Sequence, residues 1–216
     1  MSKIARFLIS AFAIFGAGYF LSEKATWGFT IARLSTAHDL GFQNHNDPTP
    51  YLQQRFFLQN QGGQSYVFFS EDGQYALKFF KEMPRPWLTK ASYQQKKWGK
   101  LSRTLTGYQL AFDHLTEETA LLSLHLKPTS TPLFATLVDR LHIEHTIDLS
   151  SVYFVIQKRV EPLTFTQFQT HIQAIHTLLQ KRDAAHIADH DPRLHSNIGW
   201  SDGHPVFIDP GRFSHD

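Results

Sequence analysis

The sequence predicts an α+β fold with an amino-terminal lobe built on an antiparallel sheet with one helix, a reduced helical carboxy-terminal lobe, and a transmembrane helix before both. An uncharged run near the amino terminus, three apolar runs separated by turn residues, and two stretches with helical spacing lead to this prediction. The expected units are a membrane anchor (1–22), a linker (23–50) and a folded domain (51–216). Within the domain we expect a sheet lobe (51–160) and a small helical lobe (161–216).

The composition of the chain is that of a folded protein. Its 216 residues are 42% hydrophobic and 14% aromatic, which is enough for a core. A formal net charge of +2 gives no reason to expect nucleic acid as a partner. Because the sequence contains no cysteine, disulfides, thiolate catalysis and cysteine-ligated zinc are excluded.

The amino-terminal run predicts attachment to membrane lipid through residues 4–21. Residues 7–22 carry no charge, and large apolar side chains cover every face of a helix drawn over them. A removable signal peptide would need small residues at its cleavage site, but the run ends in Tyr19, Phe20 and Leu21. An uncleaved single-pass anchor is therefore expected, with a signal peptide or a buried helix as the alternatives.

Hairpins and then a helix are expected in the sheet lobe. In residues 55–81, "QNQGGQ" and "EDGQ" separate three apolar runs, which predicts three antiparallel strands. Residues 101–126 then show helical spacing. The stripe on one face of that helix consists of Ala111, Leu115, Glu118 and Leu122.

Two further strands and a second helix follow. The runs "LFATLVDRLHIE" (133–144) and "VYFVIQKRV" (152–160) predict strands, and the second is apolar enough to be central in the sheet. Residues 161–183 predict a helix capped by Thr164 or Thr166. An Asp-rich loop and a short hairpin, "NIGW" paired with "PVFID", complete the domain.

Phosphoryl transfer from a nucleotide requires backbone over the phosphates, a cation on them, oxygen ligands for magnesium and a carboxylate near the attacking hydroxyl. The stretch "QNQGGQSYV" offers Gly62 and Gly63, which let the backbone come close to a phosphate. "YALKFF" places Lys78 in an apolar strand. The alternative readings are an ordinary hairpin turn and a lysine on the wet face of its strand.

A polar stretch near the end of the sequence carries the remaining groups. "HDPRLHSNIGW" contains Asp191 and Asn197, and "VFIDPGRF" places Asp209 at the end of an apolar strand. Taken in order, these motifs resemble those of the protein-kinase-like superfamily, which includes the protein kinases and the aminoglycoside and choline phosphotransferases. The resemblance covers roughly residues 55–213 and implies a protein-kinase-like fold.

The resemblance implies roles for the residues of the sheet lobe. Gly62 and Gly63 would cover the phosphates of ATP, and Lys78 would hold the first two of them. The family pairs this lysine with a helix glutamate, for which Glu118 and its neighbour Glu117 are the candidates. A solvated pair of glutamates is the alternative.

The resemblance also implies that Mg²⁺ accompanies ATP, with Asn197 and Asp209 as the metal ligands and Asp191 as the catalytic base. Asp191 precedes Asn197 by six residues, whereas the family has five, so Asp189 stays open as the base. A capped turn with local hydrogen bonds is the alternative reading of this loop.

These motifs predict a membrane-anchored, ATP- and Mg²⁺-dependent phosphotransferase of unknown substrate, with its domain on the cytoplasmic side, where ATP is available. The sequence stops soon after Asp209, so the activation segment and substrate-docking helices of ordinary kinases are not expected. A catalytically inactive kinase-like module that binds nucleotide or a partner is therefore the main alternative. An unrelated membrane-tethered α+β domain is the third.

The carboxy-terminal stretch has residue types that also occur in two other chemistries. Its histidines and aspartates could suggest a transition-metal site; they are His186, His190, His195, His204, Asp189 and Asp191. In His-Asp phosphohydrolases the pair lies on a helix, whereas Pro192 indicates a loop here. A Ser/His/Asp hydrolase is disfavoured because a G-x-S-x-G nucleophile elbow is missing from the sequence.

Basic residues gather between positions 78 and 103, where Glu82 is the one acidic residue. They are Lys78, Lys81, Arg85, Lys90, Lys96, Lys97, Lys100 and Arg103, with Tyr93 and Trp98 among them. A solvated helix face is the simplest interpretation of this run. Contact with anionic lipid next to the anchor is the functional alternative.

Overall fold

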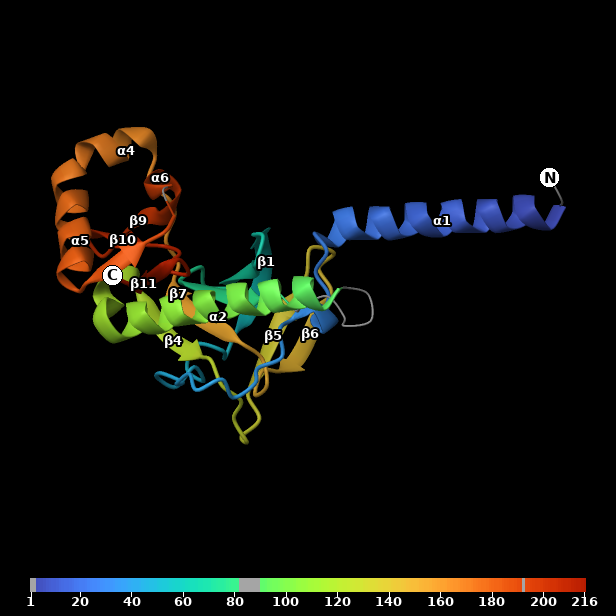
Figure 1. Cartoon of the computed structure of the whole chain (residues 1–216), viewed down its shortest axis with the longest axis horizontal. Helices are drawn as coiled ribbons and strands as arrows, with labels where there is room; N and C mark the ends of the chain where they lie inside the picture. Colours follow the sequence, from blue (N-terminus) through green and yellow to red (C-terminus); the bar gives the residue numbers. More distant parts are fainter. Residues whose placement is uncertain (1–2, 82–89, 192) are drawn as a thin grey trace.

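The computed structural model describes residues 3–81, 90–191 and 193–216. A long helix, α1 (Lys3–Thr26), projects from one end of a mixed α+β domain (Figure 1). Within these three ranges, no helix combines the length and the mean hydropathy that crossing a bilayer requires. α1 covers the range in which we predict an anchor, and the anchor stays a prediction.

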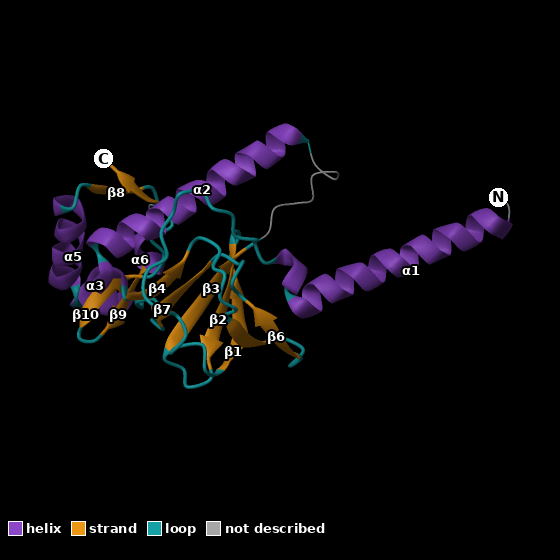
Figure 2. Cartoon of the chain, turned by 90° about the horizontal axis from the view of Figure 1, so that it is seen from below, coloured by secondary structure: helices purple, strands orange, loops and turns teal. Residues whose placement is uncertain are grey.

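A seven-stranded sheet forms the centre of the domain (Figure 2). Its strands are β1 (Arg55–Gln61), β2 (Ser65–Ser70), β3 (Tyr75–Phe80), β4 (Leu121–His125), β5 (Phe134–Val138), β6 (Glu144–Asp148) and β7 (Phe154–Lys158), in the order β4-β7-β3-β2-β1-β5-β6. The three antiparallel strands predicted over residues 55–81 are confirmed. The purely antiparallel sheet is wrong, because β1 and β5 pair in parallel. β4 lies at one edge of the sheet, and the chain then crosses toward the opposite edge, where β5 lies beside β1. A crossover of this kind permits parallel pairing.

The central position of the strand in residues 152–160 is confirmed, since β7 is buried between β3 and β4. The single strand predicted over residues 133–144 is wrong in its extent. Asp139 accepts backbone hydrogen bonds from Leu141 (2.8 Å) and Ile143 (3.0 Å), and this turn folds the run back into the hairpin β5–β6.

The long helix of the sheet lobe differs from the prediction at both ends. It begins ten residues earlier, as α2 (Ala91–His114), and is followed by one short turn, α3 (Thr116–Thr119). Ala120 adopts the left-handed conformation (φ 52°), which ends the helix. The next residues then enter β4, where Leu121 and Leu124 are buried in the sheet. The helical spacing of the sequence in this part was therefore coincidental.

The small lobe contains α4 (Phe165–Thr170), α5 (Ile172–Ala184), β8 (Ile187–Asp189), α6 (Leu194–Asn197), β9 (Ile198–Ser201), β10 (His204–Phe207) and β11 (Phe213–His215). Thr164 caps α4 in a capping box with Gln167, so the first of the two proposed caps is correct. The hairpin β9–β10 is confirmed. The pairing of β8 with β11 was not predicted, and it places Asp189 opposite Phe213.

The residues predicted as a linker pack on the sheet. Phe29, Leu34 and Ala37 are buried, and a short 3-10 helix, η1 (Ile31–Arg33), lies among them. Leu34 bridges to Lys81 at the end of β3. This segment therefore joins α1 to the domain by direct contacts, because its apolar side chains complete one of the two main core clusters.

Candidate functional site

Lys78 of β3 links the sheet lobe to the small lobe. Its side chain is buried, with 6% of the residue exposed, and Nζ donates a hydrogen bond to the carbonyl oxygen of Ile208 (2.6 Å). Burial lowers the pKa of Lys78, and the negative charge of Asp209 opposes this shift. The predicted phosphate-binding lysine and the predicted metal ligand Asp209 therefore lie at the same place.

The turn Asp209-Pro210-Gly211 presents an exposed carboxylate beside α2. The hydroxyl of Tyr108 on α2 donates to Oδ1 of Asp209 (3.1 Å), and the backbone N–H of Gly211 donates to the same oxygen (3.3 Å). Burial, reinforced by Asp209, raises the pKa of Tyr108, which therefore remains a neutral donor. These two bonds orient Asp209.

Two glycines allow α2 to approach this turn. A Cβ at Gly107 would lie 2.5 Å from the carbonyl oxygen of Pro210 and 3.1 Å from backbone atoms of Gly211 and Phe213. On the opposite side, a Cβ at Gly211 would lie 3.0 Å from the methyl group of Thr104. The backbone of α2 is thus packed directly on the backbone of the Asp209 turn.

Asp191 lies in the loop after β8, and Asn197 is the last residue of α6, directly before β9. Arg193 binds both carboxylate oxygens of Asp191, with Nε 3.0 Å from Oδ1 and Nη2 2.7 Å from Oδ2. The pKa of Asp191 is lowered mainly by Arg193, with a smaller effect of the nearby Asn197 amide. Nδ2 of Asn197 is buried, yet no partner lies within ordinary hydrogen-bond geometry among the described residues. A buried, unsatisfied amide is unusual and is a feature of sites that bind a ligand or an ion.

Asp189 lies beneath this loop, at the end of β8. It accepts a hydrogen bond from the backbone N–H of Asp191 (2.9 Å), and Arg182 approaches its Oδ2 at 3.9 Å. Burial is the main cause that raises the pKa of Asp189. The two candidate bases therefore differ: Asp189 is a buried support of the loop, and Asp191 is held by an exposed arginine.

The predicted glycine loop forms the turn between β1 and β2. Gly62 donates its N–H to Ser65 O (2.9 Å), and its carbonyl accepts from Nζ of Lys81 (2.7 Å). A Cβ at Gly63 would meet no heavy atom within 4 Å, so the tip of the turn is open. The turn reaches α2 because Thr104 donates to the side chain of Gln64, the next residue (3.3 Å). It therefore flanks the helix that carries Tyr108.

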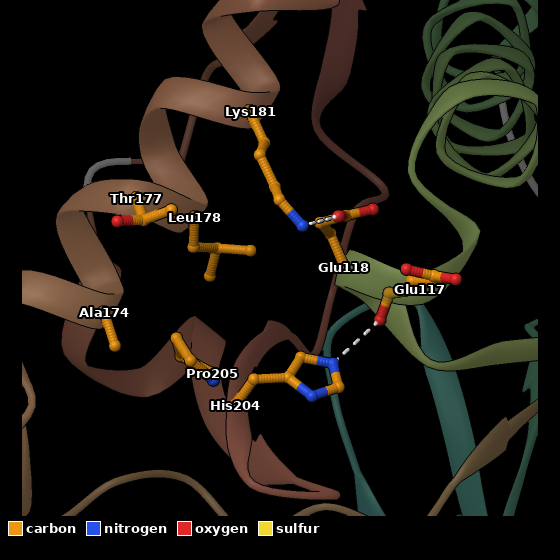
Figure 3. Close-up of a pocket in the computed structure, with 8 residues that line it drawn as sticks. All are labelled: Glu117, Glu118, Ala174, Thr177, Leu178, Lys181, His204 and Pro205. Carbon is orange, nitrogen blue, oxygen red and sulfur yellow. Dashed lines mark hydrogen bonds and ion pairs between the residues drawn. The ribbon is translucent and has the colours of Figure 1, made fainter.

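The pair predicted between Lys78 and Glu118 is not formed in the structure. Glu118 accepts a hydrogen bond from Lys181 of α5 (2.6 Å), and Figure 3 shows both side chains on the wall of a pocket between α3, α5 and β10. This pocket has a volume of about 380 Å³, and Glu117 lines it as well. α2 ends at His114, so neither glutamate lies on it, and the residue of α2 that contacts Asp209 is Tyr108.

Two histidines of the small lobe contact nearby polar groups. His190 contacts the hydroxyl of Ser214 (2.8 Å), and His204 lies 3.5 Å from the carbonyl oxygen of Glu117. Within the described ranges, no three His, Asp or Glu side chains are arranged to hold a metal by themselves. Pro192, which indicated a loop here, lies outside the described residues, as does Arg85 of the basic run.

Three residues of this site were not predicted from the sequence. Tyr108 and Gly107 belong to a helix that the sequence predicts only by its apolar stripe. The pairing of Arg193 with Asp191 is not predicted by the sequence. A glycine inside a helical stretch was the available signal for Gly107, because glycine costs helix stability and persists where a close approach requires it.

Comparison with known proteins gave a partial likeness in structure. No family model and no curated protein matches the sequence. Among solved structures, WbdD bound to a kinase inhibitor is 16% identical with a TM-score of 0.38, covering 73% of this chain and 33% of its own. A structure of WbdD as a bifunctional kinase-methyltransferase is 16% identical with a TM-score of 0.37, covering 81% and 34%.

The chain spans about a third of the length of the WbdD structures it matches. The described residues form a mixed α+β architecture around a seven-stranded sheet. At these identities and TM-scores the likeness assigns no activity, so the function considered next rests on the residues of this chain.

Proposed function

We propose that this protein is an ATP- and Mg²⁺-dependent phosphotransferase of kinase-like fold, attached to the membrane through residues 4–21. The observation that carries the proposal is the junction of Lys78 with the Asp209 turn. A buried lysine and an exposed carboxylate, contributed by different lobes, meet beside a loop that holds a second carboxylate and an unsatisfied amide. Such an arrangement supports the binding of a nucleotide triphosphate with its metal.

The donor set suits magnesium, which prefers oxygen ligands. Among the described residues, both hydrogen bonds accepted by Asp209 go to Oδ1, so Oδ2 is the oxygen proposed for the metal. The side chain of Asn197 would supply a second oxygen, and its buried amide would then gain a polar ligand as a neighbour. Bound magnesium would supply charge neutralisation at the phosphates. Lys78 would leave the Ile208 carbonyl and donate to a phosphate oxygen.

The transfer itself would break the bond between the γ-phosphorus and its bridging oxygen while a bond to the acceptor oxygen forms. The acceptor hydroxyl gives its proton to a carboxylate, for which we propose Asp191 because it lies next to Asn197 and above Asp189. Asp189 would position the loop through its bond to the Asp191 backbone. Its raised pKa keeps it as the alternative base.

A second candidate function is that of a catalytically inactive kinase-like module that binds nucleotide or a partner. One observation favours it: Lys78 donates to a backbone carbonyl and Glu118 is engaged by Lys181. The lysine–glutamate pair that orients phosphates in active kinases is therefore missing.

Titration of the full-length protein with ATP, in the presence and absence of Mg²⁺, tests the shared prediction of nucleotide binding. Calorimetry should show Mg²⁺-dependent binding that Lys78→Met and Asp209→Asn each weaken. Lys127→Met is the control, because Lys127 lies outside the site, two residues after β4, and its Nζ contacts Gln43. Equal affinity in all four proteins would refute nucleotide binding at this place.

Release of labelled phosphate from bound ATP then separates the two candidates, with water replacing the unknown acceptor. A slow turnover that Asp191→Asn removes without loss of ATP affinity indicates the phosphotransferase. Binding without any turnover above buffer indicates the inactive module.

The membrane attachment and the cytoplasmic side are tested separately. Protease added to intact cells should leave the domain uncut and should digest it after lysis. Cleavage in intact cells would contradict the proposed side of the membrane, because ATP would not be available there.

A further inference from the structure

In the amino-terminal half of α2, contacts with the rest of the fold are made by partly buried residues, among them Trp98, which packs on a core cluster. The first buried residue of α2 is Leu101, so from Ala91 to Lys100, about 15 Å of helix, no residue is buried. At its start, Lys90 makes no side-chain cap, and the first turn contains no acidic residue. The amino-terminal end of a helix normally has a capping side chain and acidic residues in its first turn. This half of α2 therefore lacks the usual local stabilisation.

Its charge is of one sign. No acidic residue occurs in α2 before Asp113, and the cations of this part are Lys96, Lys97, Lys100 and Arg103, preceded by Lys90. Lys97 stands over the ring of Tyr93 (5.6 Å), whose residue is 43% exposed. Burial and then the neighbouring cations, including Arg212, lower the pKa of Lys100, so these charges repel one another. An anionic surface would relieve this repulsion.

The same side of the domain carries α1, and α1 is firmly attached. Arg33 binds the carboxylate of Glu23 in α1 through two hydrogen bonds and the carbonyl of Gly28 (2.8 Å). From the β5–β6 turn, Arg140 donates to the carbonyl of Lys24 (3.1 Å), and its guanidinium stacks on the ring of Trp27 at 4.4 Å. In both Figure 1 and Figure 2, α1 and the amino-terminal end of α2 project toward the same side. A clamped α1 thus fixes where this end of α2 lies relative to the membrane.

We propose that residues 90–103 dock on the anionic phospholipid headgroups of the membrane that α1 enters. The inference rests on the membrane attachment in the proposed function and adds its partner and orientation. Lysines would meet headgroup phosphates, and the exposed Tyr93 is suited to the interfacial region. The domain is then held in one orientation, with the cationic half of α2 against the bilayer.

Flotation of the full-length protein with lipid vesicles tests this docking. One set of vesicles contains phosphatidylcholine alone, and the other contains phosphatidylcholine mixed with phosphatidylglycerol. The combined variant Lys96→Gln, Lys97→Gln and Lys100→Gln should lower the ratio of anionic to neutral affinity on the order of 100-fold. Added salt should lower the same ratio for the wild type.

A matched control removes three cations outside α2, one after β4 and two at and directly after the end of β7: Lys127→Gln, Lys158→Gln and Arg159→Gln. This control should change the ratio much less, and both variants should unfold at the wild-type temperature. Equal losses in the two variants would overturn the proposal, because net charge would then explain the effect. The proposal would also be overturned if the α2 variant bound a DNA duplex or polyglutamate more weakly than the wild type but bound vesicles equally well.

Two outcomes separate this proposal from the attachment on which it rests. Absence of binding to neutral vesicles defeats the membrane attachment through α1. An anionic preference that the α2 variant fully retains defeats the docking alone. As a second measurement, amide hydrogen exchange over residues 91–100 should slow with anionic vesicles and should remain unchanged with neutral ones.

Discussion

Replacing Gly107 by alanine tests whether close packing of α2 on the Asp209 turn holds the site together. The added Cβ would meet the carbonyl oxygen of Pro210 at 2.5 Å and backbone atoms of Gly211 and Phe213 at 3.1 Å. Backbone atoms cannot rotate away as a side chain can, so either the helix or the turn must move. Tyr108, the next residue, holds Asp209, and a shift here would therefore misplace that carboxylate.

Two opposing effects set the expected magnitude. Alanine in a helix interior is about 1 kcal/mol more favourable than glycine. Overpacking a close contact costs about 1–3 kcal/mol. Because three backbone atoms lie too close to the added carbon, we expect the cost to dominate and the free energy of unfolding to fall by about 1–2 kcal/mol. For a chain of this size, that lowers the melting temperature by about 2–8 °C.

Gly99→Ala is the matched control on the same helix, since a Cβ at Gly99 would meet no heavy atom within 4 Å. It should raise the free energy of unfolding by up to about 1 kcal/mol. Thermal and urea unfolding of both variants measure the difference, and ATP titration shows whether Gly107→Ala also weakens binding. A stabilising Gly107→Ala with unchanged ATP affinity would refute the reasoning.

Four other substitutions give distinct results. Burial raises the folded-state pKa of Asp189 above its unfolded value, so the stability of the wild type relative to Asp189→Asn should fall as the pH rises. In urea melts the variant should be more stable than the wild type at neutral pH and equally stable below about pH 4. Lys181→Met should lower stability by at most about 1 kcal/mol and leave ATP affinity unchanged, whereas a weakened affinity in calorimetry would contradict the separation of Glu118 from Lys78. Thr164→Ala should cost about 1 kcal/mol in urea melts, and Thr166→Ala much less, because the cap is Thr164; equal costs would be inconsistent with the capping box.

Local patterns in the sequence were sufficient for several elements. The hairpins of β1–β3 and of β9–β10 follow from apolar runs separated by glycine-containing turns, and Thr164 was recognised as a possible cap. These features depend on neighbouring residues, so they can be predicted without knowledge of the rest of the chain. The grouping of Lys78 with Asp209 was expected from the resemblance to kinase-like enzymes, and the structure brings the two residues together.

Other features depend on contacts between distant residues. The start of β4 could be mistaken for helix. In a strand that is buried on both faces, apolar residues can also recur at spacings of three and four. The parallel pairing of β1 with β5 depends on a crossover of the sheet, for which no local signal exists. Both outcomes are decided by burial in the complete sheet.

The chain by itself determined which residues are available for phosphate and metal chemistry: a lysine in an apolar strand, and three aspartates and an asparagine in the carboxy-terminal stretch. Only the tertiary structure decided their partners. Glu118 was turned toward Lys181, and Tyr108 was placed on Asp209, because α2 stops at His114 and Gly107 lets its backbone contact the Asp209 turn. Hydrogen bonds between side chains require atoms within about 3 Å, and residues some hundred positions apart reach that distance only through packing of the whole domain.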